Sequence, residues 1–126
     1  MKIVKVAGAM LLAFGAGIPA MAQTADGAKL FASRCAVCHW DPGKPGEQVR
    51  MGPSLTNVVG RKAGTHPKFT RYSAAMKAYG QPWTEANLNA YLENPRGVVR
   101  GTNMAFMGLK KPEERAAVIA YLKKPR

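Results

Sequence analysis

The feature that most constrains this chain is Cys35-Ala36-Val37-Cys38-His39, in which two cysteines three positions apart are followed directly by a histidine. A C-x-x-C-H run is the attachment site of a c-type haem: both thiols add to the haem vinyl groups, and the imidazole lies beside the iron. A thioredoxin-like disulfide would leave His39 without a role, and no βαβ pattern flanks the motif. A structural zinc site needs four ligands, and only His66 remains beyond these three. The motif therefore predicts one covalent haem c.

The N-terminal segment has the composition of an export signal. Two lysines precede an apolar stretch over residues 6–18, which is too short to span a bilayer, and Ala20-Met21-Ala22 supplies a small-x-small cleavage pattern. We expect residues 1–22 to be a signal peptide that is removed, leaving residues 23–126 as a single domain. An uncleaved membrane anchor is the alternative. We expect the exported chain to be located in the periplasm.

Charge is strongly lopsided. The chain carries 19 Lys and Arg against 7 Asp and Glu, a formal net charge of +12, and only Lys2 and Lys5 of the cations lie in the signal segment. A basic surface suits nucleic acid, anionic lipid or the acidic face of a protein. Export argues against nucleic acid, and the basic residues are scattered singly along the chain. We therefore expect a docking face for acidic protein partners.

The periodic segments predict an all-α fold of short helices joined by Gly- and Pro-rich loops and wrapped around the cofactor. The helices are expected at about residues 25–35, 72–78, 84–94 and 112–124, where Thr84 is the expected N-cap of the third and Pro112 the first position of the fourth. Pro95 is expected to end the third helix, and residues 96–109 to form a loop. Residues 41–52 are expected to form a surface loop that folds back near the haem.

The two terminal helices are expected to cross closely. Gly27 falls on the apolar face of the first helix, and Tyr121 lies on the apolar face of the last. Because glycine has no side chain, it lets two backbones approach each other.

Motifs in order along nearly the whole of residues 23–126 resemble a class I cytochrome c, of the group formed by mitochondrial cytochrome c and bacterial cytochrome c2. Beyond the haem motif, the resemblance is carried by Gly52-Pro53-Ser54-Leu55, Gly60-Arg61-Lys62-Ala63-Gly64, Phe69 with Tyr72, Trp83-Thr84, Tyr91-Leu92-Glu93-Asn94-Pro95, Gly101-Thr102-Asn103-Met104-Ala105-Phe106 and Ala120-Tyr121-Leu122-Lys123-Lys124.

The resemblance implies a haem iron with two protein ligands and no open position. His39 would be the fifth ligand and Met104 the sixth, and the Pro53 carbonyl would accept a hydrogen bond from the other nitrogen of His39. Met104 could instead be core filler, and Met107 is the neighbouring alternative ligand.

The remaining matched residues would surround the haem. Arg61, Tyr72 and Trp83 match residues that hydrogen-bond or neutralise a buried haem propionate. Tyr91 and Thr102 match residues around the methionine sulfur and the inner propionate, and Phe106 matches an aromatic side chain beside the exposed haem edge. Plainer roles are a solvated charge for Arg61, a helix staple for Trp83 and core packing for Tyr91.

Four residues either differ from the family pattern or have no place in it. The family usually has proline and lysine where this chain has Arg100 and Asn103, so we expect a less rigid ligand loop. Trp40, directly after the ligand histidine, is unusual and has no explanation in the sequence. His66 lies in a polar loop between Thr65 and Pro67, and we expect it to be exposed to solvent and not to bind the iron.

The function that the resemblance implies is one-electron transfer and not enzymatic catalysis. The chain would be a monomeric carrier that shuttles between a membrane-bound bc1-type reductase and an oxidase or photosynthetic reaction centre. A dedicated electron acceptor of a periplasmic dehydrogenase is an alternative. A haem enzyme or gas sensor, which would need a displaceable methionine, is a further one.

Overall fold

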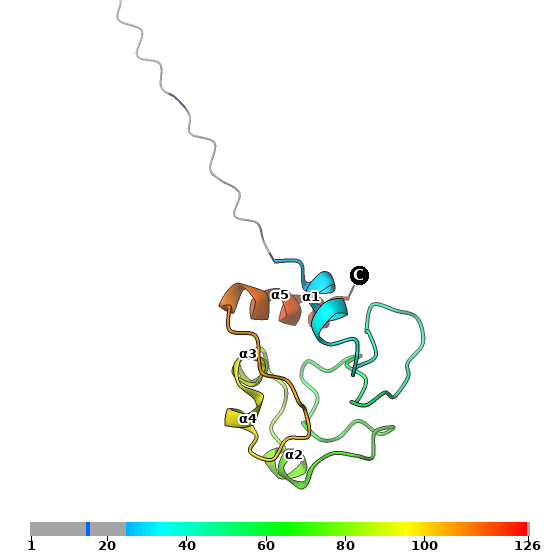
Figure 1. Cartoon of the computed structure of the whole chain (residues 1–126). Coiled ribbons are helices and arrows are strands. Elements are labelled where there is room, and N and C mark those ends of the chain that lie inside the picture. The colour runs from blue at the N-terminus through cyan, green and yellow to red at the C-terminus, as the bar shows by residue number, and fades with distance from the viewer. Residues whose placement is uncertain (1–14, 16–24, 126) are drawn as a thin grey trace, which may run out of the picture.

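The computed structural model describes residue 15 and residues 25–125. Apart from residue 15, the predicted signal peptide lies outside the described residues, as does its cleavage site. Five helices follow one another in this part of the chain: α1 (Gly27–Arg34), α2 (Ala74–Tyr79), α3 (Glu85–Glu93), α4 (Pro95–Val98) and α5 (Pro112–Lys123) (Figure 1). Residues 25–125 contain no strand, only an isolated bridge between Lys62 and Pro82. The predicted all-α fold is confirmed.

The terminal helices α1 and α5 pack against each other at one end of the molecule (Figure 1). A Cβ atom at Gly27 would overlap the main-chain carbonyl of Ala117 and lie 2.9 Å from the Cβ of Tyr121. The rings of Phe31 and Tyr121 meet beside this point, with centroids 5.7 Å apart. The predicted close crossing is therefore present, and its closeness requires glycine.

Helix α3 begins where the sequence predicts, because the Thr84 hydroxyl accepts a hydrogen bond from the main-chain N–H of Asn87 at 3.1 Å. Its buried residues are Leu88, Tyr91 and Leu92, and it packs against α4 and α5.

The prediction that residues 96–109 form only a loop is wrong at its start. Pro95 does not simply end a helix: it is the first residue of α4, where its missing N–H costs nothing. The side chain of Asn94 caps this short helix by accepting from the N–H of Gly97 at 3.0 Å. Residues 99–111 then run without helix or strand to α5.

Helix α2 begins later than predicted. The hydroxyl of Ser73 accepts from the main-chain N–H of Met76 at 3.0 Å and sets the start at Ala74. Gly80, with φ +51°, ends it in the left-handed conformation.

The loop after the haem motif is held to the last helix by one polar contact. The Tyr121 hydroxyl donates to Asp41 Oδ1 at 2.5 Å, and the same oxygen accepts from the N–H of Gly43 at 2.9 Å. Burial, together with the Asp41 carboxylate, raises the pKa of Tyr121 to about 12, so its hydroxyl stays protonated at neutral pH. This contact joins residues that are 80 positions apart in sequence.

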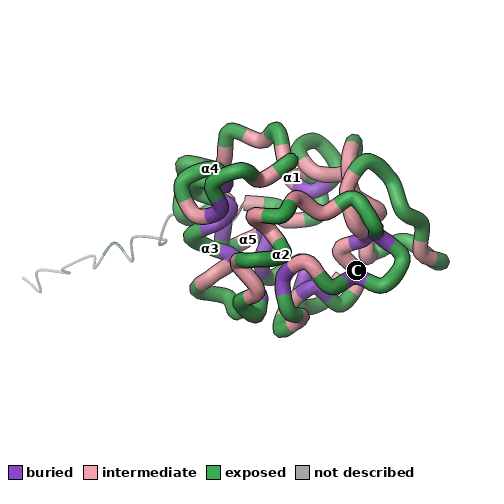
Figure 2. The backbone as a smooth tube through the Cα atoms, turned by 90° about the horizontal axis from the view of Figure 1, so that it is seen from below, coloured by how far each residue is buried: buried purple, intermediate pink, exposed green. Residues whose placement is uncertain are grey.

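Buried side chains form one apolar core, in which the faces of α1, α3 and α5 meet the inner sides of the loops. Figure 2 shows the buried stretches on the inward sides of the helices, with exposed loops around them. None of the helices in the described part of the chain has the length and apolarity that crossing a bilayer requires.

The Gly27 contact predicts an unusual stability effect. Gly27→Ala should lower the melting temperature by about 5–15 °C, because overpacking costs about 1–3 kcal/mol. The loss should appear although alanine is the better helix former by about 1 kcal/mol. Ser33→Ala, at an exposed position of the same helix, is the control and should leave the melting temperature nearly unchanged, as measured by circular dichroism. A rise in melting temperature for Gly27→Ala would contradict the close crossing.

Candidate haem site

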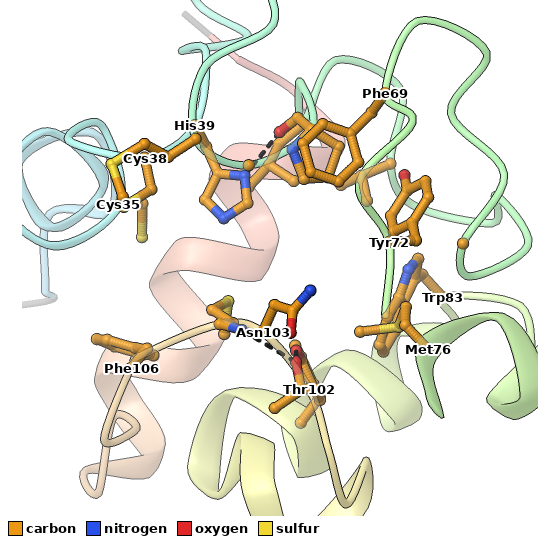
Figure 3. A pocket seen from close by; sticks show the side chains of 18 of the residues that line it. Cys35, Cys38, His39, Phe69, Tyr72, Met76, Trp83, Thr102, Asn103 and Phe106 are labelled. Carbon is orange, nitrogen blue, oxygen red and sulfur yellow. Dashed lines mark hydrogen bonds between the residues drawn. The ribbon is translucent and has the colours of Figure 1, made fainter. Parts of the chain in front are cut away.

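A cavity of about 480 Å³ opens between the haem motif, residues 51–73, the face of α3 and the segment 102–106 (Figure 3). This volume is within the range of about 300–1,000 Å³ that is typical of small-molecule and cofactor sites. Most of its lining is apolar or aromatic: Val37, Met51, Pro53, Leu55, Val58, Phe69, Met76, Trp83, Leu88, Tyr91, Leu92, Met104, Ala105, Phe106 and Leu122.

One wall carries the two thiols, which the end of α1 places. The N–H of Cys35 bonds to the carbonyl of Phe31 at 2.9 Å, and the N–H of His39 bonds to the carbonyl of Cys35 at 2.9 Å. This turn brings Cys35, Cys38 and His39 to the cavity together, and both thiols are half-buried (Figure 3). Burial and the neighbouring Cys38 raise the pKa of the Cys35 thiol to about 11.

The imidazole of His39 is fixed from behind. Its Nδ1 lies 2.7 Å from the carbonyl oxygen of Pro53, which can only accept, so Nδ1 carries the proton and Nε2 keeps its lone pair. Burial lowers the pKa of His39, and Arg61 lowers it further against the opposing effect of the Pro53 carbonyl. The ring is therefore a neutral nitrogen donor, the form that binds a metal.

Gly52 makes this orientation possible, and sequence reasoning did not assign it a role of its own. Its N–H bonds to the carbonyl of Cys38 at 2.8 Å, and a Cβ atom there would lie 2.6 Å from Cε1 of His39. Only glycine lets the backbone pass this close to the imidazole.

The opposite wall of the cavity is formed by residues 102–106 (Figure 3). The hydroxyl groups of Tyr91 and Thr102 are hydrogen-bonded at 2.8 Å, and Thr102 Oγ1 accepts from the N–H of Met104 at 3.3 Å. Burial raises the pKa of Tyr91, so this phenol remains a neutral hydrogen-bonding group. Met104 lines the cavity, whereas Met107 is 77 % exposed and does not. The structure thus separates the two methionines that the sequence left as alternatives.

Arg61, Tyr72 and Trp83 all line the cavity and bring polar groups to it. The Arg61 guanidinium donates to the carbonyls of Ser54 and Thr56, both at 3.1 Å, and burial lowers its pKa. No carboxylate among the described residues forms a salt bridge with it. A half-buried guanidinium of this kind is stabilised by an additional anion.

The expectation that His66 is exposed is wrong: it is 5 % exposed. Its Nε2 donates to Glu47 Oε1 at 2.7 Å, its Nδ1 accepts from the N–H of Lys68 at 3.2 Å, and its own N–H bonds to the hydroxyl of Tyr72 at 3.2 Å. These partners satisfy the buried ring. Glu47 lies 19 residues away, so the local sequence gave no sign of the pairing. His66 is not among the residues that line the haem cavity.

Trp40, which the sequence left unexplained, closes the loop that follows the haem motif. Its indole N–H donates to the carbonyl of Gly46 at 2.9 Å, and the guanidinium of Arg50 lies 5.4 Å from the centroid of its ring. The same guanidinium donates to the carbonyl of Ala36 at 2.6 Å. Trp40 and Arg50 therefore fold the loop back onto the haem motif, as predicted for residues 41–52.

These features fit a haem. The cavity is apolar and is lined by two thiols, a neutral imidazole donor, a methionine and a half-buried guanidinium. This set matches a flat apolar macrocycle with an iron centre and acidic propionates. Elsewhere in the described residues, no group of three or more His, Cys, Asp or Glu side chains could hold a separate metal ion.

The comparisons with known proteins agree with this geometry. The cytochrome c family model matches residues 24–125. Cytochrome c2 of Rhodomicrobium vannielii is 47 % identical over 97 % of this chain and 95 % of its own length, and cytochrome c2 of Afifella marina is 48 % identical over 79 % of each chain. The structure of cytochrome cH from Methylobacterium extorquens superposes with a TM-score of 0.69 at 38 % identity and covers 79 % of this chain and 98 % of its own.

The fold and site are those of a c-type cytochrome with a single haem. The chain belongs to the cytochrome c family. It accordingly holds one covalent haem c and is an electron-transfer protein, not an enzyme.

The pair formed by Glu47 and His66 predicts a pH-dependent stability. The hydrogen bond from His66 lowers the pKa of Glu47. The stabilisation that this bond gives is therefore complete above the ordinary glutamate pKa of about 4.3, and it is lost as the pH falls through the lowered pKa of Glu47. Glu47→Gln should therefore reduce the free energy of unfolding at pH 7 by about 1 kcal/mol, and this difference should shrink toward zero near pH 2–3.

Urea unfolding at both pH values measures the effect. Glu93→Gln, at an exposed carboxylate without a recorded side-chain hydrogen bond, is the control and should show no such pH-dependent difference. An equal loss of stability at both pH values for Glu47→Gln would contradict the assignment.

Proposed function

We propose that Cys35 and Cys38 form the two thioether bonds to the haem and that His39 and Met104 are the two iron ligands. The observation that carries this proposal is that Met104 lines the same apolar cavity as His39. Its neighbours Thr102, Asn103 and Phe106 lie across that cavity from His39 (Figure 3). Arg61, Tyr72 and Trp83 would surround a propionate, while Tyr91, Thr102 and Phe106 would support the methionine side and the exposed haem edge.

The cofactor supplies a one-electron couple, and the protein sets its surroundings. Pro53 orients His39 and increases its basicity through the hydrogen bond to Nδ1. Thr102 and Tyr91 hold the main chain of Met104. A neutral thioether ligand and an apolar lining both favour the reduced state, and two resident ligands leave little rearrangement between oxidation states. These features suit a carrier.

We further propose that the protein is an exported, periplasmic, monomeric carrier between a membrane-bound reductase and an oxidase or photosynthetic reaction centre. The cytochrome c2 proteins that it resembles and the export-like segment over residues 1–22 support this proposal. Its partners would present acidic faces to an exposed set of basic residues: Lys29, Arg34, Arg96, Arg100, Lys110 and Lys111. Arg34 also lines the cavity mouth, which places positive charge beside the redox centre.

The ligand assignment predicts a spectroscopic change. Met104→Ala should abolish the far-red absorption band of methionine–iron coordination in the oxidised protein, because the thioether sulfur is removed. It should also let the reduced protein bind carbon monoxide at neutral pH. Met107→Ala, at the exposed methionine, is the matched control and should keep the band. A band that survives in Met104→Ala would overturn the assignment. Carbon monoxide binding by the unaltered protein would favour a haem enzyme or gas sensor.

The docking proposal predicts an electrostatic effect on rate. Arg34→Gln should slow bimolecular electron transfer with an acidic redox partner at low ionic strength, because the cation steers the encounter. The difference should largely disappear well above 0.1 M salt, where the Debye length is below about 10 Å. Lys124→Gln, which removes an exposed charge at the end of α5, is the control for stopped-flow measurements. Rates that do not depend on ionic strength would contradict a basic docking face.

A further inference from the structure

Three hydrogen bonds in series connect the haem motif to the segment that carries Met104. Arg50 bonds to Ala36, Arg71 bonds to Arg50, and Asn103 bonds to Arg71. We call the side chains of Arg50, Arg71 and Asn103 the arginine strap. They come from three separate loops, and Ala36 and Asn103 lie on the two opposed sides of the haem cavity.

The first bond joins the strap to the wall that carries the thiols. Arg50 Nη1 donates to the carbonyl oxygen of Ala36 at 2.6 Å, and Ala36 lies between Cys35 and Cys38. The guanidinium also packs over the ring of Trp40, so two contacts hold it in place. This end of the strap is thus attached to the most fixed part of the site.

The second and third bonds cross to the opposite wall. Arg71 Nη2 donates to the carbonyl of Arg50 at 2.7 Å, and its guanidinium lies 5.6 Å from the centroid of the Phe69 ring. The main-chain carbonyl of Arg71 accepts from Nδ2 of Asn103 at 3.3 Å. Figure 3 shows Asn103 across the cavity from His39, next to Thr102.

The segment that receives the strap is weakly held around Met104: Leu109 bonds to the carbonyl of Leu92, but residues 103–108 make no hydrogen bond between main-chain groups within the described part of the chain. Residues 99–111 contain no helix or strand, and the N–H of Met104 bonds only to Thr102 Oγ1 among its recorded contacts. Tyr91 anchors Thr102 from the α3 side. The Asn103 bond supplies a second anchor, so the two residues before Met104 are each held: Thr102 by Tyr91 and Asn103 by Arg71.

We propose that Arg71, with Arg50 and Asn103, is a positioning residue that holds the Met104 segment closed over the haem. This inference rests on the proposed role of Met104 as iron ligand. This gives a role to Asn103, which departs from the family pattern, because its amide completes the strap. The strap restrains a loop in which Arg100 stands where the family usually has a proline.

Imidazole added to the oxidised holoprotein tests the strap, because it binds the iron only when the Met104 segment opens. Its apparent affinity is therefore proportional to the open fraction. Arg71→Leu removes the donor and should raise imidazole affinity about three- to tenfold, the change in population expected when one such hydrogen bond is lost. Asn103→Ala should give a similar increase, and the double variant should bind no more tightly than either single one, since both break the same chain.

Two controls separate positioning from a general loss of charge or stability. Arg96→Leu removes an exposed arginine whose side chain makes no hydrogen bond to the described residues, and Lys123→Gln removes the contact between Lys123 and Glu85, neither of which lines the cavity. Neither should change imidazole affinity by more than about twofold, a change smaller than the loss of one hydrogen bond produces. Arg71→Lys, which keeps a charge and a donor, should lie between Arg71→Leu and the unaltered protein.

The outcomes are distinct. Equal imidazole affinities for Arg71→Leu, Asn103→Ala and Arg96→Leu, with the methionine–iron band present in all three, would overturn the strap and leave the proposed function intact. Absence of that band from the unaltered protein would overturn the Met104 assignment and the strap together. Asn103→Ala leaves both arginines in place, so it decides the question even if Arg71→Leu does not fold.

Discussion

The turn from Cys35 to His39 is the constraint on which the rest of the structure depends. In the proposed assignment these five residues carry both attachment points and one iron ligand, so the cofactor could occupy only one place relative to the end of α1. The remaining chain must then enclose a flat apolar body from that fixed edge. Helix α1 is itself held by the backbone contact between Gly27 and Ala117, which makes the packing of α1 on α5 the base of the site.

Much of the cavity is built from irregular chain, and side-chain bonds to distant residues give that chain its shape. The loop after the haem motif is tied to α5 through Asp41 and Tyr121, and to the next loop through Glu47 and His66. Each pair satisfies polar groups that burial would otherwise leave without partners. Such contacts replace the repeated backbone bonds of a helix or sheet, so the loops have defined positions without secondary structure.

The site is closed on both sides of the plane that the cofactor would occupy, and this distinguishes a carrier from a catalyst. His39 is fixed by Pro53 on one wall, and the Met104 segment is held through Thr102 on the other. A substrate would need an open coordination position, whereas electron transfer needs only an exposed edge and a small rearrangement. The chain belongs to the cytochrome c family, which agrees with a site built for electron transfer.

The sequence by itself determined the features that depend on local chemistry. The haem motif, the caps at Thr84 and Pro112 and the apolar stripes follow from spacing and from neighbouring residues, and so the all-α fold could be predicted. Helix α4 was missed because Pro95 suggested only the end of α3, whereas Asn94 in fact caps the start of α4. Only the tertiary structure decided which polar groups meet across long separations: that His66 is buried against Glu47, that Trp40 holds its loop with Arg50, and that a strap crosses the cavity. No local pattern encodes these pairings, because each depends on where two loops are placed by the packing of everything between them.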